Sequence, residues 1–183
     1  MRAIDVRDLL ETPGSSRTVH VEEPVPGLRT ELADVPEDTP IAADLTLESV
    51  VEGIFVRGSL EGRFAMRCAR CLKTFERDFD VEMTELVPRE PGPDDDYALE
   101  PDLTLDPEPI VRDAVVLEMP FSPLCRPDCL GLCEICGGDR NLGECPGHEV
   151  TDPRWDALDV LVQHLEAQPN QEPSDDDDRT TTS

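Results

Sequence analysis

Aromatic residues are scarce in this chain of 183 residues, since Trp, Tyr and Phe make up only 4% of it. Cations are few as well, and the net charge is -26. Little apolar surface on a strongly self-repelling chain predicts one domain with tails or inserts and excludes two large cores. No stretch approaches the roughly 18 uninterrupted apolar residues of a membrane span. Charges also interrupt residues 1–10, which lack the apolar segment of a secretory signal, so we expect a cytoplasmic protein without a membrane partner.

Cysteine carries the strongest signal in the chain. Seven cysteines and one histidine form four close pairs: Cys68 with Cys71, Cys125 with Cys129, Cys133 with Cys136, and Cys145 with His148. Thiolate and imidazole are the ligands of tetrahedral structural zinc sites. Thiols stay unpaired in a reducing cytosol, and an odd number of cysteines also argues against disulfides. The eight residues therefore predict two structural Zn²⁺ sites. An iron–sulfur cluster, a redox-active pair and metal-free thiols are the alternatives.

The four pairs can be grouped in more than one way. We favour one ion on Cys133, Cys136, Cys145 and His148, and a second on Cys68, Cys71, Cys125 and Cys129. Each doubling of a loop costs only about 0.6 kcal/mol, whereas a structural zinc contributes on the order of 10 kcal/mol. The alternative places Cys125, Cys129, Cys133 and Cys136 around one ion and joins Cys68 and Cys71 to Cys145 and His148. In both groupings every ligand position is filled, so we expect no metalloenzyme and no small-molecule substrate.

Hydrophobic patterning predicts an α+β fold: a small antiparallel β-rich domain with one or two helices and a zinc-knuckle-like cysteine cluster. Apolar and polar residues alternate before and after the first cysteine pair, as strands require. Gly53, Gly58 and Gly62 indicate bends or bulges. A helix is expected from Asp106 as N-cap, with Pro107 at its first position, to Pro120. A second helix is expected from Pro153 to about Leu165.

These patterns divide the chain into five parts. The expected boundaries are 1–16 for an N-terminal segment, 17–87 for a β-rich region with the first cysteine pair, 88–103 for an acidic flexible insert, 104–167 for a helix, the second cysteine cluster and a C-terminal helix of the same domain, and 168–183 for a disordered acidic tail. The insert and the tail are rich in proline and aspartate and have little to bury.

One stretch of this acidic chain is locally basic. Between residues 57 and 77 it carries six basic and two acidic residues. The basic residues are Arg57, Arg63, Arg67, Arg70, Lys73 and Arg77. Cations among aromatic residues suit contacts with RNA. The alternative is that the arginines neutralise the thiolates and a solvated face, which a net charge of -26 favours because it repels a polyanion. The acidic insert and tail would instead attract a basic protein.

Four blocks of the sequence resemble one known family. They are Arg67-Cys68-Ala69-Arg70-Cys71-Leu72, Leu117-Glu118-Met119-Pro120-Phe121-Ser122-Pro123-Leu124-Cys125, Asp128-Cys129-Leu130-Gly131-Leu132-Cys133 with Cys136-Gly137, and Asp152-Pro153-Arg154-Trp155-Asp156-Ala157-Leu158. In this order, over roughly residues 15–165, they are similar to the YceD family, also called large ribosomal RNA subunit accumulation protein. His148 departs from the family, which often has a cysteine there.

The resemblance implies a non-catalytic factor needed for the accumulation of large-subunit (23S) rRNA and for biogenesis of that subunit. The partner would be large-subunit rRNA or a pre-ribosomal particle. A binding module or chaperone for a basic ribosomal protein is the alternative.

Overall fold

The structure is a computed structural model that describes residues 1–148 and Leu158. It divides the chain into two units, Met1–Glu144 and Cys145–Ser183. The elements of the first unit are β1 (Ile4–Asp5), α1 (Arg7–Glu11), β2 (Ser16–Glu23), β3 (Ala33–Asp34), β4 (Ile41–Ser49), β5 (Gly53–Arg67), β6 (Thr74–Pro88), β7 (Thr104–Leu105), α2 (Glu108–Glu118) and the 3-10 helix η1 (Arg140–Leu142). Antiparallel strands with two α-helices confirm the predicted α+β class. No helix among the described residues is long and apolar enough to cross a membrane.

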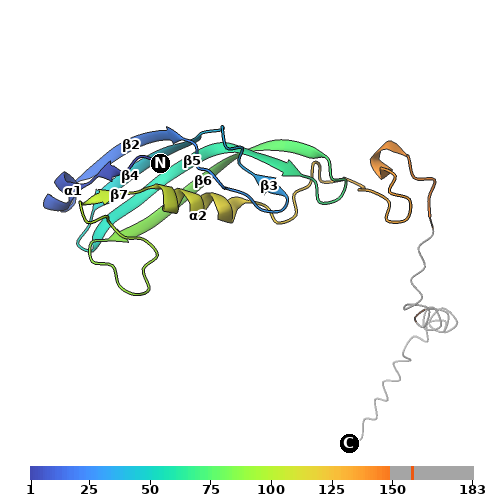
Figure 1. Ribbon diagram of the computed structural model, residues 1–183. Coiled ribbons are helices and arrows are strands. Elements are labelled where there is room, and N and C mark those ends of the chain that lie inside the picture. Colours follow the sequence, from blue (N-terminus) through green and yellow to red (C-terminus); the bar gives the residue numbers. More distant parts are fainter. Residues whose placement is uncertain (149–157, 159–183) are drawn as a thin grey trace, which may run out of the picture. The chain divides into compact units, whose positions relative to one another are not determined.

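The main sheet is antiparallel and has β5 at its centre (Figure 1). β6 pairs with β5 along the whole length of both strands, from Gly53 opposite Pro88 to Arg67 opposite Thr74. The other edge of β5 is shared, because β4 pairs with its first half and the short β3 with its last residues. β2 then pairs with β4 and completes the sheet.

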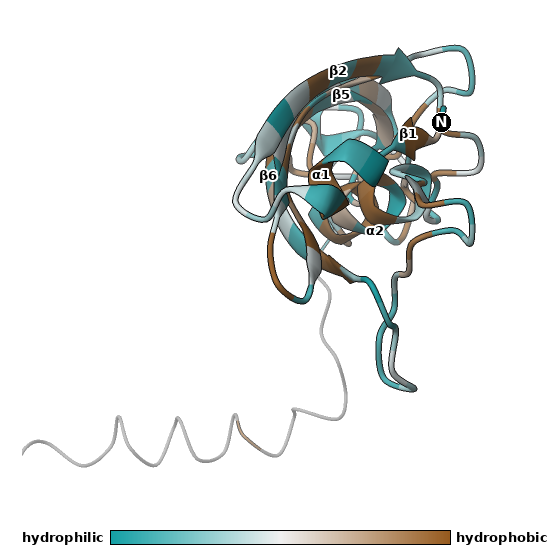
Figure 2. Ribbon diagram, turned by 90° about the vertical axis from the view of Figure 1, so that its left-hand side faces the viewer, coloured by the Kyte–Doolittle hydropathy of each residue, from teal (hydrophilic) through white to brown (hydrophobic). Residues whose placement is uncertain are grey.

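One face of this sheet forms the core. Ile41, Ala43, Leu45 and Leu47 of β4 are buried, whereas the side chains between them are partly or fully exposed. Figure 2 shows the strands curving around α1 and α2, so that the buried face is the concave one. The helix α2 adds Ile110, Val111 and Val115 to this core. The alternation of apolar and polar residues therefore reflects a sheet with one face packed against the core and the other face exposed to solvent.

Three segments differ from the sequence expectations or add to them. Residues 1–16, which had no assigned structure, form β1 and α1, and β1 pairs with β7. The helix α2 begins one residue later than predicted, with Pro107 at the N-cap, while Asp106 still accepts a hydrogen bond from the Glu108 amide (2.9 Å). The predicted second helix and the tail 168–183 lie outside the described residues, apart from Leu158.

The acidic segment 88–103 is a loop that contacts the core. The Tyr97 hydroxyl donates to an Asp113 carboxylate oxygen at 2.9 Å. Leu99 and Leu103 pack against the hydrophobic cluster of the sheet. The mobility of this segment stays a prediction.

The glycines of β5 do not mark bulges, because pairing with β6 is continuous past Gly58 and Gly62 and pairing with β4 is continuous past Gly58. Gly62 lies opposite Phe79, and a Cβ atom at Gly62 would lie 2.5 Å from the Phe79 ring. The missing side chain lets the Phe79 ring lie over the strand and stack on Phe64, with ring centroids 4.3 Å apart.

Candidate metal centre at the hairpin end

Cys68 and Cys71 lie in the turn that joins β5 to β6. Beyond the last strand pair, the Cys68 amide donates to the Lys73 carbonyl and the Leu72 amide donates to the Cys68 carbonyl, both at 2.9 Å. Leu72 has a φ of 60°, a left-handed conformation that is uncommon outside glycine. The tight turn brings the two thiols to one side of the hairpin end.

Cys125 and Cys129 follow α2 on a segment that is fastened to this turn. The Ala69 amide donates to the Pro123 carbonyl at 2.8 Å. The Arg70 guanidinium donates to the Cys129 carbonyl, also at 2.8 Å. Two regions more than fifty residues apart in the sequence are thereby held side by side, with their cysteines facing one another.

The sulfur positions match a tetrahedral metal ion. The Sγ atoms are 3.8 Å apart for Cys68 and Cys129 and 3.7 Å apart for Cys71 and Cys125. All four sulfurs lie within 4.8 Å of one another. A tetrahedron of sulfurs at about 2.3 Å from zinc has edges of about 3.8 Å, whereas a disulfide requires about 2.05 Å. These four cysteines can therefore hold a metal ion, as in the grouping favoured by the sequence.

The electrostatics of Cys68 and Cys125 also favour a bound cation. Burial raises the pKa of Cys68, but hydrogen bonds from the amides of Cys125, Cys71 and Arg70 outweigh it and lower the pKa to about 6. Burial and the neighbouring thiols raise the pKa of Cys125 to about 12. One thiolate is thus stabilised by backbone amides, whereas further negative charge at the same place requires a positive ion.

Asn141 contacts this centre from a more distant segment of the chain. Its side-chain amide nitrogen is 3.6 Å from the Cys129 sulfur, to which it donates. Its Oδ1 atom accepts from the Leu130 amide at 2.8 Å and from the Arg126 guanidinium at 2.6 Å. The side chain therefore supports both the sulfur and the backbone next to it, as residues outside the ligand shell do in metal sites.

Lys73 and Asp139 form an ion pair beside the centre, with Nζ 2.7 Å from Oδ2. Asp139 is only 5% exposed. The ammonium of Lys73, followed by the amide of Asn141, lowers the pKa of Asp139 to about 2. Asp139 and Asn141 are not among the site residues predicted from the sequence. The sequence does hold a signal for Asp139, because aspartate commonly caps a helical turn. In the structure the Asp139 side chain caps η1 by accepting a hydrogen bond from the Asn141 amide.

The second cysteine cluster is divided between the two units. Cys133 and Cys136 belong to the first unit, where the Cys133 amide donates to the Gly138 carbonyl and the Gly137 amide to the Cys133 carbonyl. Gly137 has a φ of 71°, as the predicted knuckle turn requires. Cys145 and His148 belong to the second unit. An ion shared by these four residues stays a prediction.

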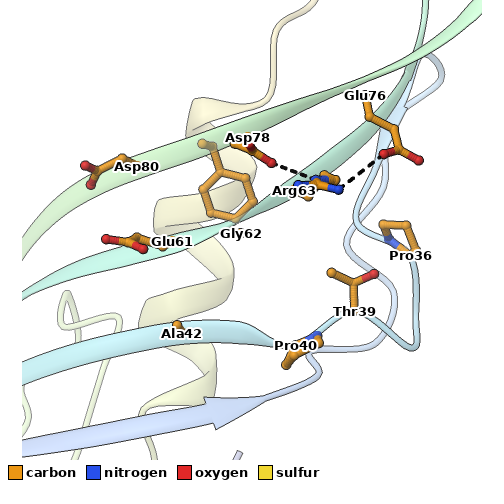
Figure 3. Close-up of a pocket in the computed structure, with 11 residues that line it drawn as sticks. Pro36, Thr39, Pro40, Ala42, Glu61, Gly62, Arg63, Glu76, Asp78 and Asp80 are labelled. Atoms are coloured by element: carbon orange, nitrogen blue, oxygen red, sulfur yellow. Dashed lines mark hydrogen bonds and ion pairs between the residues drawn. The ribbon is translucent and has the colours of Figure 1, made fainter.

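The structure does not bring the six basic residues to one face. Arg57, Arg63 and Arg67 lie on the convex face of β5, whereas Arg77 alternates with them and lies on the concave side of β6. Arg57 pairs with Glu48 of β4 at 3.2 Å. Arg63 pairs with Asp78 at 2.6 Å and with Glu76 at 3.6 Å, both from β6 (Figure 3).

The carboxylates that pair with Arg57 and Arg63 come from the two strands that flank β5, namely β4 and β6. These pairings depend on strand register, and they neutralise Arg57 and Arg63 but not Arg67. Whether any of the six residues contacts RNA stays a prediction.

The fold and the cysteine cluster define a class: a mostly-β α+β protein with four cysteines at the end of its longest hairpin that could hold a metal ion. The family model of YceD, described as Large ribosomal RNA subunit accumulation protein, matches residues 56–162, more than half of the chain. Uncharacterised proteins of Mycobacterium tuberculosis and Mycobacterium bovis are 37% identical over 164 residues, covering 85% of this chain and 78% of theirs. One of Mycobacterium leprae is 31% identical over 167 residues, covering 86% and 76%. The chain therefore belongs to the YceD family. No solved structure matches it significantly.

Proposed function

We propose that this protein is a non-catalytic factor that supports accumulation of large-subunit rRNA and assembly of that subunit in the cytoplasm, by binding the RNA or an assembly intermediate. The proposal rests on membership of the YceD family, which is described as Large ribosomal RNA subunit accumulation protein. The metal would be zinc with a structural role, because four cysteines fill a tetrahedron and leave no position open for a substrate. In this proposal the metal ion keeps the surface that contacts the RNA or the assembly intermediate folded.

The RNA contact that we propose is the hairpin end. Arg67 is exposed there and makes no ion pair among the described residues, unlike Arg57 and Arg63. Phe121 is 98% exposed and lies two residues before Pro123, whose carbonyl accepts a hydrogen bond from the Ala69 amide of the turn. An unpaired guanidinium and an exposed aromatic ring on the two segments that meet at the hairpin end suit phosphate contact and base stacking with single-stranded RNA.

Depletion of the protein tests the function. We expect large-subunit rRNA to fall relative to small-subunit rRNA, and the wild-type protein to restore it. An Arg67→Glu/Phe121→Ala variant should fail to restore it and should lose crosslinks to large-subunit rRNA, whereas Arg89→Glu, at the opposite end of β6, should behave as wild type. Unchanged rRNA after depletion would refute the function. Unchanged crosslinks of the double variant would refute the surface.

A second candidate is a binding module or chaperone for a basic ribosomal protein. It is favoured by an open groove of about 690 Å³ on the convex side of the sheet. Figure 3 shows Glu61, Asp78 and Asp80 along this groove, with Pro36 and Pro40 on its other side. Crosslinks from this face to a ribosomal protein, with none from the hairpin end to rRNA, would favour the second candidate over the first.

A further inference from the structure

The strand β6 has a long edge that pairs with no other strand of the described residues. Two hydrogen bonds show which of its residues face that edge. At one end the Cys68 amide donates to the Lys73 carbonyl, and at the other the Arg89 amide donates to the Glu52 carbonyl. Hydrogen-bonded pairs recur at every second residue of an antiparallel ladder. The odd-numbered residues of β6 therefore bond to β5, and the even-numbered residues direct their N–H and C=O groups outward.

The residues that face outward carry a row of carboxylates. Glu76, Asp78, Asp80 and Glu82 occupy four successive even positions, and all four are exposed. Their side chains lie on the convex face, where Glu76, Asp78 and Asp80 line the groove of Figure 3. Arg63 neutralises part of this charge through Asp78 and Glu76. Asp80 and Glu82 make no ion pair with any residue in the described part of the chain.

We propose that an extended, basic segment of a partner protein adds to the β6 edge as a further strand. Its backbone would bond to the outward amides and carbonyls, and Lys or Arg at every second position would lie beside the carboxylate row. Main-chain bonds give affinity in this mode, and the alternating side chains give selectivity. The proposal rests on the second candidate function, a basic protein partner, and names where and how that partner binds.

The charge of the edge selects this occupant over two others. A second copy of the chain would place carboxylates against carboxylates, on top of a net charge of -26 on each copy. RNA would meet the same repulsion along the row. A lysine-bearing or arginine-bearing strand meets attraction at every second residue and finds unpaired backbone groups at the same spacing.

Synthetic ten-residue peptides test the mode of binding. In the parent peptide lysine alternates with valine, and a control has the same composition with the lysines in one block. We expect the alternating peptide to bind about tenfold more tightly in fluorescence anisotropy, because only its lysines share one face of a strand. Equal affinity of the two peptides would indicate charge attraction alone and would overturn the proposal.

N-methylated peptides separate strand addition from simple charge attraction. Methylating the lysine amides removes the N–H groups that an antiparallel added strand would direct at β6, and methylating the valine amides removes those of a parallel strand. Neither change alters the charge. One of the two methylated peptides should lose binding while the other keeps it. If both bind as the parent does, no strand forms and the proposal fails.

Protein variants locate the contact. Asp80→Asn/Glu82→Gln removes two carboxylates from the row, and Glu11→Gln/Glu22→Gln removes two exposed ones elsewhere with the same change in net charge. We expect about tenfold weaker peptide binding for the first variant and no change for the second. Equal affinities would place the peptide elsewhere. If the peptides fail while depletion still lowers large-subunit rRNA, the edge proposal falls and the proposed function stands. If the peptides bind while depletion leaves large-subunit rRNA unchanged, the edge proposal stands and the proposed function falls.

Discussion

Lys73 is the only lysine in the chain, and its position shows how a basic residue can serve the fold. Its ammonium group binds the buried carboxylate of Asp139, and this contact raises the pKa of Lys73. A buried carboxylate without a partner is costly, so this cation is engaged within the protein. Arg70 is engaged in the same way, at the Cys129 carbonyl. Of the cations at the turn, Arg67 has the freest side chain for a partner.

Asn141 is the residue at which the structure adds most to the sequence-based site, and replacing it provides a test. Asn141→Ala removes the donor to the Cys129 sulfur and the acceptor of the Leu130 amide. We expect metal affinity to fall by about 10- to 100-fold, as for other residues that orient ligands. Competition with a chromophoric chelator measures it. Leu142→Ala, at the exposed neighbouring position, is the control. Identical competition curves for both variants would show that Asn141 does not support the centre.

At the scale of elements, periodicity predicted most of what the structure contains. The strands β4, β5 and β6 follow from alternation, and α2 from its apolar stripe and the Asp106-Pro107 start. The spacing of the cysteines likewise predicted which four meet at the hairpin end. The strands and α2 are predictable because their patterns are local in sequence. The cysteine grouping is predictable because closely spaced cysteines have few roles other than metal binding.

Features that depend on distant contacts were not predictable in the same way. The short β1 and β7 are only two residues each, and they form because they pair across about a hundred residues. The neutralisation of Arg57 and Arg63 depends on the register of three strands, which alternation alone does not determine. The contact of Asn141 with Cys129 depends on how one loop folds over another.

Gly62 tests the packing of the β5–β6 hairpin. Gly62→Ala places a Cβ atom 2.5 Å from the Phe79 ring, which is stacked on Phe64 and cannot withdraw freely. We expect a loss of about 1–3 kcal/mol in the free energy of unfolding, measured by urea denaturation, because overpacking forces side chains off their preferred rotamers. Gly92→Ala is the matched control, since its Cβ would lie 3.4 Å from only one exposed side chain. Equal stability of the two variants would mean that the Phe79 ring adapts without cost.

At the scale of the whole molecule, the sheet core and the cysteine cluster at the hairpin end are separate hydrophobic clusters. The larger cluster joins the concave face of the sheet to α1 and α2 and contains no cysteine. The smaller one consists of Cys68, Cys71 and Cys129, with Phe75 and Leu124 packed against it. Phe75 contacts both clusters. A metal ion on the four cysteines would therefore order the hairpin end and the segment bound to it, whereas the larger cluster is formed without cysteine.

Metal removal should therefore unfold one end of the protein and spare the rest. Without a cation, the four thiols lose the charge balance that holds the turn against residues 121–144, and burial of three cysteines contributes little by itself. With a strong chelator we expect faster hydrogen exchange at amides such as Ala69 and Leu132, whose carbonyl partners lie across this contact, and unchanged exchange in β4 and the middle of β5. Cys68→Ser/Cys71→Ser should reproduce this pattern without chelator. Loss of protection throughout the sheet would contradict the separation of the two clusters, because the larger cluster would then need the metal to remain folded.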